Sequence, residues 1–192
     1  MIRKIKERFL EKRLQSVLKN QNRQKSFLSF DEVKTIGIVF EATDPEQFEI
    51  VKNYVLALKQ KGKRVHGIGF YDNKLIPDNV YYSKTDFDLF SAKEISPLGE
   101  PLNPYIKTFI TEVRDVLIDI NFNQKYALRH IVAHSYAKCK IGLNLPENNS
   151  VHDMMIAIDK EQGIEKYLEQ IEKYLNMIVS KQEVKIKTWQ KK

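Results

Sequence analysis

Acidic residues stand where several predicted strands end, and carboxylates in such places can bind Mg²⁺ or transfer protons. They are Glu41, Asp44, Asp72, Asp119 and Asp159. Because the carboxyl ends of parallel strands share one edge of a sheet, we expect the first four to line a crevice there. Helix capping explains Asp44 and a turn explains Asp72 equally well, so the pattern by itself predicts no metal site.

Two histidines offer a second arrangement with chemical potential. His130 and His134 lie four residues apart on a predicted helix, close enough for both imidazoles to reach one metal ion. Zinc proteases place Glu directly after the first His, whereas Ile131 stands there, and no third ligand is identifiable. We therefore favour packing against the sheet, while His66 and His152 fit no pattern.

The loop after the first predicted strand reads Glu41-Ala42-Thr43-Asp44-Pro45. A nucleotide fold keeps a glycine-rich phosphate cradle in this place. Two carboxylates repel phosphate and proline removes a backbone donor, so we expect neither dinucleotide binding nor P-loop hydrolysis, and no cofactor. The sequence also lacks the Gly-x-Ser-x-Gly motif of the α/β-hydrolases, so it gives no sign of a hydrolase. Catalysis is thus disfavoured.

Cys139 is the only cysteine of the chain, so no internal disulfide can form. Its neighbours Lys138 and Lys140 would activate the thiol only if they approached the sulfur, and in a strand they point elsewhere. We expect a small buried side chain. No apolar stretch has the length of a signal peptide or a membrane span, which predicts a cytoplasmic location.

The net charge of +7 is concentrated at the two ends of the chain. Residues 1–25 contain two acidic residues, Glu7 and Glu11, against nine basic ones: Arg3, Lys4, Lys6, Arg8, Lys12, Arg13, Lys19, Arg23 and Lys25. Residues 181–192 carry five Lys and one Glu, and the stretch between these ends has more acidic than basic residues. The protein is an acidic body with basic ends.

Three roles suit the first 25 residues. Apolar residues recur at helical spacing from Ile2 to Leu18, so the segment is an amphipathic helix followed by a polar linker. Its lysines and arginines fit RNA, free or within a ribosomal particle, by displacing counterions from phosphates. An anionic membrane surface also fits, with Ile2, Ile5, Phe9 and Leu10 embedded. The third role is structural, with the apolar side packed on the body.

The pattern of strands and helices predicts an α/β fold. Strands are expected at 35–40, 64–70, 116–120, 140–143 and 154–158, and helices at 2–18, 45–61, 104–110, 125–138 and 163–179. Residues 71–103 are predicted to be irregular, with β-like pieces at 80–82 and 87–90. Alternating elements favour three layers around a mostly parallel sheet of about five strands, Rossmann-like or flavodoxin-like. We divide the chain into the arm 1–25, one domain 26–180 and the tail 181–192.

Two resemblances add to this interpretation. The basic start, the run Ile36-Gly37-Ile38-Val39-Phe40-Glu41-Ala42-Thr43-Asp44, the run Asp115-Val116-Leu117-Ile118-Asp119 and the terminal helix resemble a family of uncharacterised cytoplasmic Bacteroidetes proteins of similar length. That family implies no activity. Locally, Asp115–Asp119 with Ala127-Leu128 and Ala137–Gly142 is similar to one strand-helix-strand of heptosyltransferase-type glycosyltransferases, which implies shared architecture only.

From these observations we expect a non-catalytic binding protein whose basic N-terminal arm docks on RNA or a ribosomal particle. The alternatives are a sugar- or nucleotide-like small molecule bound in the strand-end crevice, and peripheral attachment to a membrane. Converging carboxylates in a deep pocket would favour the small molecule, and scattered carboxylates would count against it.

Overall fold

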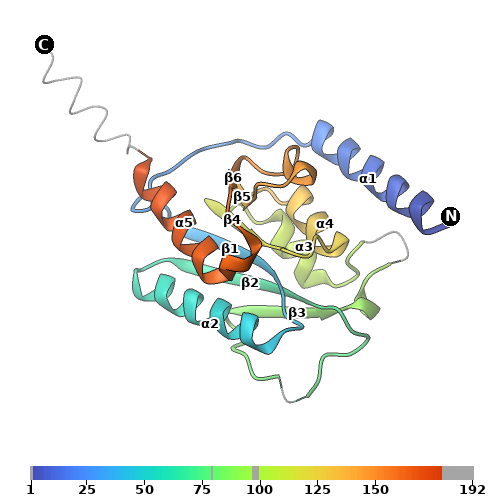
Figure 1. Ribbon diagram of the computed structural model, residues 1–192, viewed down its shortest axis with the longest axis horizontal. Helices are drawn as coiled ribbons and strands as arrows, with labels where there is room; N and C mark the ends of the chain where they lie inside the picture. The colour runs from blue at the N-terminus through green and yellow to red at the C-terminus, as the bar shows by residue number, and fades with distance from the viewer. Residues whose placement is uncertain (1, 79, 97–99, 179–192) are drawn as a thin grey trace, which may run out of the picture.

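Parallel strands form the central sheet of the computed structural model, which describes residues 2–78, 80–96 and 100–178 (Figure 1). The strands are β1 (Thr35–Glu41), β2 (Arg64–Tyr71), β3 (Phe87–Ser91), β4 (Val116–Ile120), β5 (Cys139–Leu143) and β6 (Met154–Ile156). They are ordered β3-β2-β1-β4-β5-β6, and every neighbouring pair is parallel. This is the strand order of Rossmann-type sheets, so the predicted α/β class is confirmed.

The described part of the sheet has six strands rather than about five, and the additional one is β3. It lies in the segment predicted to be irregular, whereas residues 80–82 form no strand. Phe87 and Leu89 of β3 lie against Gly67 and Gly69 of β2, where a methyl group would collide with their side chains. This edge strand depends on a close approach to a distant segment, which a local sequence pattern does not reveal.

The helices cover both faces of the sheet. They are α1 (Ile2–Asn20), α2 (Pro45–Gln60), α3 (Pro104–Thr111), α4 (Tyr126–His134) and α5 (Gly163–Met177), with single 3-10 turns at Ala92–Glu94, Pro146–Asn148 and Lys160–Gln162. Helix α4 ends at His134 instead of the predicted Lys138, because Ser135 is already extended and the chain must reach β5. Helices α2 and α5 lie on one face, and α3 and α4 on the other (Figure 1).

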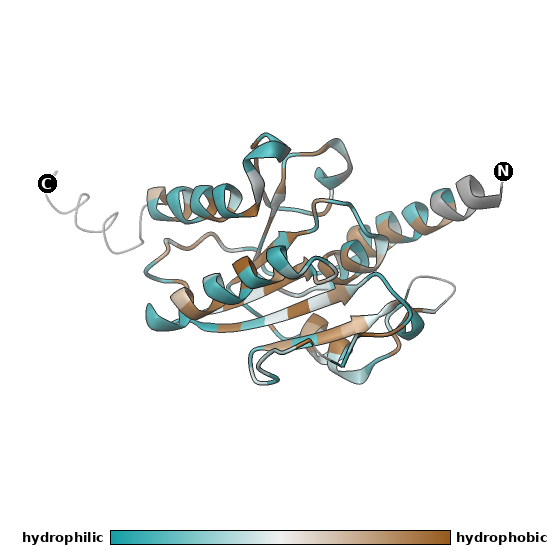
Figure 2. Cartoon of the chain, turned by 60° about the horizontal axis from the view of Figure 1, so that its bottom comes forward, coloured by the Kyte–Doolittle hydropathy of each residue, from teal (hydrophilic) through white to brown (hydrophobic). Residues whose placement is uncertain are grey.

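Each sheet face has its own apolar core. Ile38 of β1 packs with the α2 and α5 side, whereas the next residue, Val39, packs with the α3 and α4 side. A strand buried on both faces therefore reads as the continuous apolar run seen at 36–40. Hydrophobic residues gather on the strands, and hydrophilic residues alternate with them along the helices (Figure 2).

Helix α1 adds a further layer outside α4. Residues Ala127 to Ala133 of α4 are all buried, so this helix has no side that faces solvent. Leu10 and Leu14 of α1 are buried too, with 7% and 1% of their surface exposed. Leu14 belongs to the same core cluster as Leu128 and Ile131 of α4. The arm is therefore packed on the body over at least its second half, as its structural role requires.

We predict that Leu14→Ala lowers the free energy of unfolding by about 3 kcal/mol, because it leaves a cavity between α1 and α4. The measurement is urea unfolding followed by circular dichroism. Leu56→Ala is the matched control, since Leu56 also lies on a helix but is 56% exposed. Its expected effect is within about 0.5 kcal/mol. Equal, small effects of both substitutions would mean that α1 does not contribute to the stability of the domain.

Candidate functional site

The strand order reverses at β1 and β4, so the carboxyl edge of the sheet between them is where a crevice was predicted. These neighbouring strands lead to helices on opposite faces, α2 and α4, and open α/β sheets bind ligands at such a point. Glu41 ends β1, and Asp72 directly follows β2. Of the four carboxylates predicted to line the crevice, the structure brings these two together around one cation.

That cation is Lys125. Its ammonium forms an ion pair with Asp72 and lies 3.8 Å from a carboxylate oxygen of Glu41. The Asn123 amide also donates to Glu41 Oε2 at 2.8 Å. The hydrogen bond to Asp72 and the charge of Glu41 raise the pKa of Lys125. The carboxyl edge of the sheet thus holds a charge-compensated cluster in which a lysine occupies the position between the carboxylates.

Asp44 has a separate task at the start of α2. Its Oδ1 accepts hydrogen bonds from the backbone N–H groups of Glu46 at 2.9 Å and Gln47 at 3.4 Å. Pro45 has no N–H to donate. The amides that bind phosphate in a nucleotide fold are therefore occupied by the protein's own carboxylate, and the capping interpretation of Asp44 is confirmed.

Asp119 is buried in β4 and pairs with a histidine that fits no sequence pattern. Its Oδ2 lies 3.0 Å from His152 Nε2, and the two side chains are 3% and 1% exposed. His152 in turn packs over Gly142 of β5, where a methyl group would collide with the imidazole. Because both side chains are buried, Asp119 does not belong to a solvent-accessible site.

The loop that positions Lys125 is held by Asn121. The Asn121 side chain accepts from the Lys125 N–H at 2.7 Å and donates to the Lys125 carbonyl at 3.0 Å. Within this loop Gln124 adopts a φ of 54°, the left-handed region that few side chains occupy. Sequence reasoning missed Asn123 and Lys125. The available signal was their place in the loop after the predicted strand 116–120, which corresponds to the place of Glu41 after the predicted strand 35–40.

His130 and His134 are stacked on each other, with ring centroids 3.9 Å apart. Burial lowers the pKa of His130 to about 3, and burial also lowers the pKa of His134. His134 Nδ1 lies 2.8 Å from the carbonyl of His130. Over the described residues, no three His, Cys, Asp or Glu side chains gather as a metal site would require. The two imidazole rings pack against each other on α4.

Cys139 is buried, and burial raises the pKa of its thiol to about 12. The thiolate that nucleophilic or metal chemistry requires is therefore disfavoured. Lys140, the next residue of β5, has no exposed surface and points to the other face of the sheet. This arrangement agrees with a structural role for the cysteine.

Helix α1 is attached to the body by polar contacts as well as by its leucines. The Tyr126 hydroxyl donates to the Leu10 carbonyl at 3.2 Å, and Arg129 pairs with Glu11 at 2.9 Å. Arg13 pairs with Glu100. These contacts reach from the second half of α1 to α4 and to the segment before α3.

The segment after α1, predicted as a polar linker, is anchored by a buried polar cluster. Arg23 Nη2 pairs with Asp153 Oδ1 at 2.7 Å and its Nη1 donates to the Ala137 carbonyl at 2.7 Å. Lys140 Nζ donates to Gln21 Oε1 at 3.2 Å and to the Ala133 carbonyl at 2.9 Å. Sequence reasoning missed this cluster, because its members are up to 130 residues apart.

The nine basic residues predicted to bind a polyanion therefore lie in different environments. Arg13, Arg23 and Lys25 form ion pairs with acidic residues of the body, Lys25 with Asp153 at 2.9 Å. Arg8, Lys12 and Lys19 are exposed and line one open hollow of about 520 Å³ along α1. The side chains of Arg3, Lys4 and Lys6, and the tail 181–192, lie outside the described residues.

A comparison with protein-family models matches residues 6–178 to a family of unknown function, DUF6913. The chain belongs to this family. The matched range runs from α1 to the end of α5, so it joins the arm and the sheet in one unit. No curated protein and no solved structure matches the chain. The resemblances to Bacteroidetes proteins and to heptosyltransferases stay predictions.

We predict that the stability of the protein rises by about 2 kcal/mol between pH 7 and 9 through Lys140 alone. Burial lowers the pKa of Lys140 from 10.5 to about 7, an effect strengthened by Arg23 and Lys25 and opposed by Asp153. Between these two pKa values the unfolded chain binds the proton and the folded chain releases it. Raising the pH therefore favours the folded state.

The test compares urea unfolding of the wild type and Lys140→Met at pH 7, 8 and 9. Taking the difference between the two proteins removes the contribution of the other titrating groups, including Cys139, whose raised pKa acts in the opposite direction. The pH dependence should be flatter in the variant. An identical rise in both proteins would show that Lys140 is charged in the folded state.

Proposed function

We propose that the protein is a non-catalytic binding protein that docks on RNA, free or within a ribosomal particle, through the exposed side of α1. The observation that carries this proposal is the division of α1 into two sides. Leu10 and Leu14 are buried against the body, while Arg8, Lys12 and Lys19 face solvent. Lysines and arginines held in a row displace counterions from a phosphate backbone.

The geometry of the row suits an extended polyanion. Positions 8, 12 and 19 lie on one side of a helix, and the eleven steps between the first and the last span roughly 16 Å at the helical rise of ~1.5 Å per residue. The row is fixed on a folded domain rather than on a free arm, so less conformational entropy is lost on binding.

The buried leucines disfavour membrane attachment by α1. An amphipathic helix embeds its apolar side beneath the headgroups, and in this protein Leu10 and Leu14 already cover α4. Phe9, 54% exposed, is left on the outer side. No helix in the described part of the chain combines the length and apolarity that crossing a bilayer requires.

A small-molecule ligand is the second candidate, and the hollow over the ends of β1 and β2 favours it. This hollow of about 440 Å³ is lined by Ala42, Phe48, Tyr71 and Tyr81 among others, and lies at the carboxyl edge of the sheet. Its aromatic rings suit a planar or sugar ring. Because the predicted carboxylates do not converge there, this role ranks below RNA binding.

We predict that the combined substitution Arg8→Ala, Lys12→Ala and Lys19→Ala weakens RNA binding by about tenfold or more at low salt. Three lost phosphate contacts should also lower the slope of log affinity against log salt by roughly 2. Both quantities are measured by fluorescence anisotropy with a labelled mixed-sequence RNA.

The control removes the same charge elsewhere, with Lys74→Ala, Lys107→Ala and Lys173→Ala, which are exposed and lie outside α1. It should leave the slope unchanged. An equal loss of RNA affinity in both triple variants would mean that binding depends on net charge rather than on the exposed side of α1. An absence of RNA binding by the wild type would refute the proposal.

For the small-molecule candidate, we expect a library of sugars and nucleosides to contain a compound that raises the melting temperature. Tyr81→Ala should abolish that shift without changing the melting temperature of the free protein, because Tyr81 is 84% exposed and lines the hollow. The measurement is a thermal-shift screen of both proteins. A shift that persists in Tyr81→Ala would place the ligand elsewhere.

A further inference from the structure

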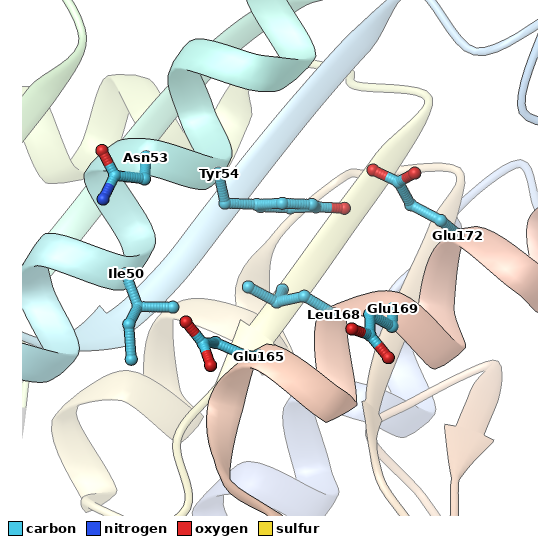
Figure 3. A pocket seen from close by; sticks show the side chains of 7 residues that line it. All are labelled: Ile50, Asn53, Tyr54, Glu165, Leu168, Glu169 and Glu172. Atoms are coloured by element: carbon cyan, nitrogen blue, oxygen red, sulfur yellow. The ribbon is translucent and has the colours of Figure 1, made fainter.

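A groove between α2 and α5 lies on the sheet face opposite to α4 and α1. It has a volume of about 450 Å³ (Figure 3). Its lining residues are Ile50, Asn53 and Tyr54 from α2, and Glu165, Leu168, Glu169 and Glu172 from α5. The side chains of Ile50 and Leu168 and the ring of Tyr54 point into the space between the helices (Figure 3). The groove therefore has an apolar floor and an acidic side.

The acidic side is a row of three carboxylates at helical spacing. Glu172 is engaged, since it accepts a hydrogen bond from Lys61 Nζ at 2.8 Å and interacts with the Tyr54 hydroxyl, whose pKa is raised by burial and by Glu172. Among the described residues, Glu169 pairs only with Lys166 of its own helix, at 2.9 Å in an exposed contact. Glu165 is exposed and makes no ion pair with any side chain that the structure describes. Two of the three carboxylates are thus available to a basic partner.

We propose that the partner is the basic tail of the same chain, residues 181–192, and that it docks in this groove. The tail follows Ile178, which caps α5, so it leaves the helix that supplies the acidic side. It carries five lysines and one glutamate, opposite in sign to Glu165 and Glu169. The inference goes beyond RNA binding by α1, and it assigns the tail to the other face of the sheet.

The alternation of apolar and basic residues in the tail is complementary to a groove with an apolar floor and an acidic side. Val184 and Ile186 alternate with Lys185 and Lys187, so an extended backbone separates apolar from basic side chains. Lysine stems are long enough to reach a charged rim while their apolar neighbours lie deeper. Trp189 supplies a large ring for the contact with the helices.

Covalent attachment makes a modest contact sufficient. A segment joined to its site by a short connection experiences an effective concentration in the millimolar range, so docking needs only millimolar intrinsic affinity. Exposed charge pairs and a few apolar contacts supply interactions of this strength. The same segment added as a separate peptide would bind weakly.

Trp189 is the only tryptophan of the chain, so intrinsic fluorescence reports on the tail without a label. In the full-length protein at low salt we expect a blue-shifted emission maximum and weak quenching by acrylamide. Salt at ~1 M shortens the Debye length to ~3 Å and should shift the emission towards that of exposed tryptophan. Emission typical of a fully exposed tryptophan at low salt would overturn the proposal.

The decisive variant reverses the available carboxylates with Glu165→Lys and Glu169→Lys. Because two attractive pairs become repulsive, we expect the acrylamide quenching constant of Trp189 to rise by about threefold. The control Asp78→Lys with Glu161→Lys makes the same change of net charge at exposed positions outside the groove. It should leave the quenching constant unchanged, and an equal rise in the control would overturn the proposal.

A charge swap separates the contact from any effect on folding. Adding Lys185→Glu and Lys187→Glu to the groove variant should restore the protection of Trp189 if these side chains meet. If the charge-swapped protein keeps its circular dichroism spectrum but Trp189 stays unprotected, the assignment is contradicted. Protection that grows with protein concentration would also contradict it, because the occupant would then be the tail of a second copy. Anisotropy with RNA tests α1 independently, so either proposal can fail alone.

Discussion

The architecture depends on the burial of α4, which has no solvent-exposed face. Residues Ala127 to Ala133 are buried on every side, which a helix in the outer layer of a three-layer fold cannot achieve by itself. A further element must cover it, and α1 does so with Leu10 and Leu14. The N-terminal segment is consequently a component of the fold. Its orientation is set by the side of α4 that it must cover.

Because α1 must cover α4, the basic side chains of α1 and of the segment after it fall into two groups. Cations that point towards the body pair with its acidic residues, as Arg13 does with Glu100 and Arg23 with Asp153. Cations that point away are left as a row on a rigid support. Among the described basic side chains of the first 25 positions, Arg13, Arg23 and Lys25 therefore fasten the segment, whereas Arg8, Lys12 and Lys19 are exposed. On the opposite face of the sheet the surface groove has the other sign.

The carboxyl edge of the sheet has the topology of a nucleotide site without its chemistry. The strand order reverses between β1 and β4, where such sheets bind nucleotides, but Asp44 occupies the backbone donors at the start of α2. Lys125 then neutralises the carboxylates on either side of it. Fold and function are separable in such sheets, because the scaffold is held by the core and the ligand is recognised by a few loop residues. Here those residues bind one another.

The sequence alone determined the features that are set by residues close together in the chain. Continuous apolar runs predicted β1 and β4, and the Asp44-Pro45 pair predicted the start of α2, because periodicity and capping act over a few residues. The charge of the N-terminal helix was evident for the same reason. Tertiary structure decided what depends on distant partners: β3 exists through its fit to Gly67 and Gly69, and Asp119 is sealed by His152. It also decided which basic side chains are paired, since burial and ion pairing arise only when segments such as Arg23 and Asp153 are brought together by the folded core.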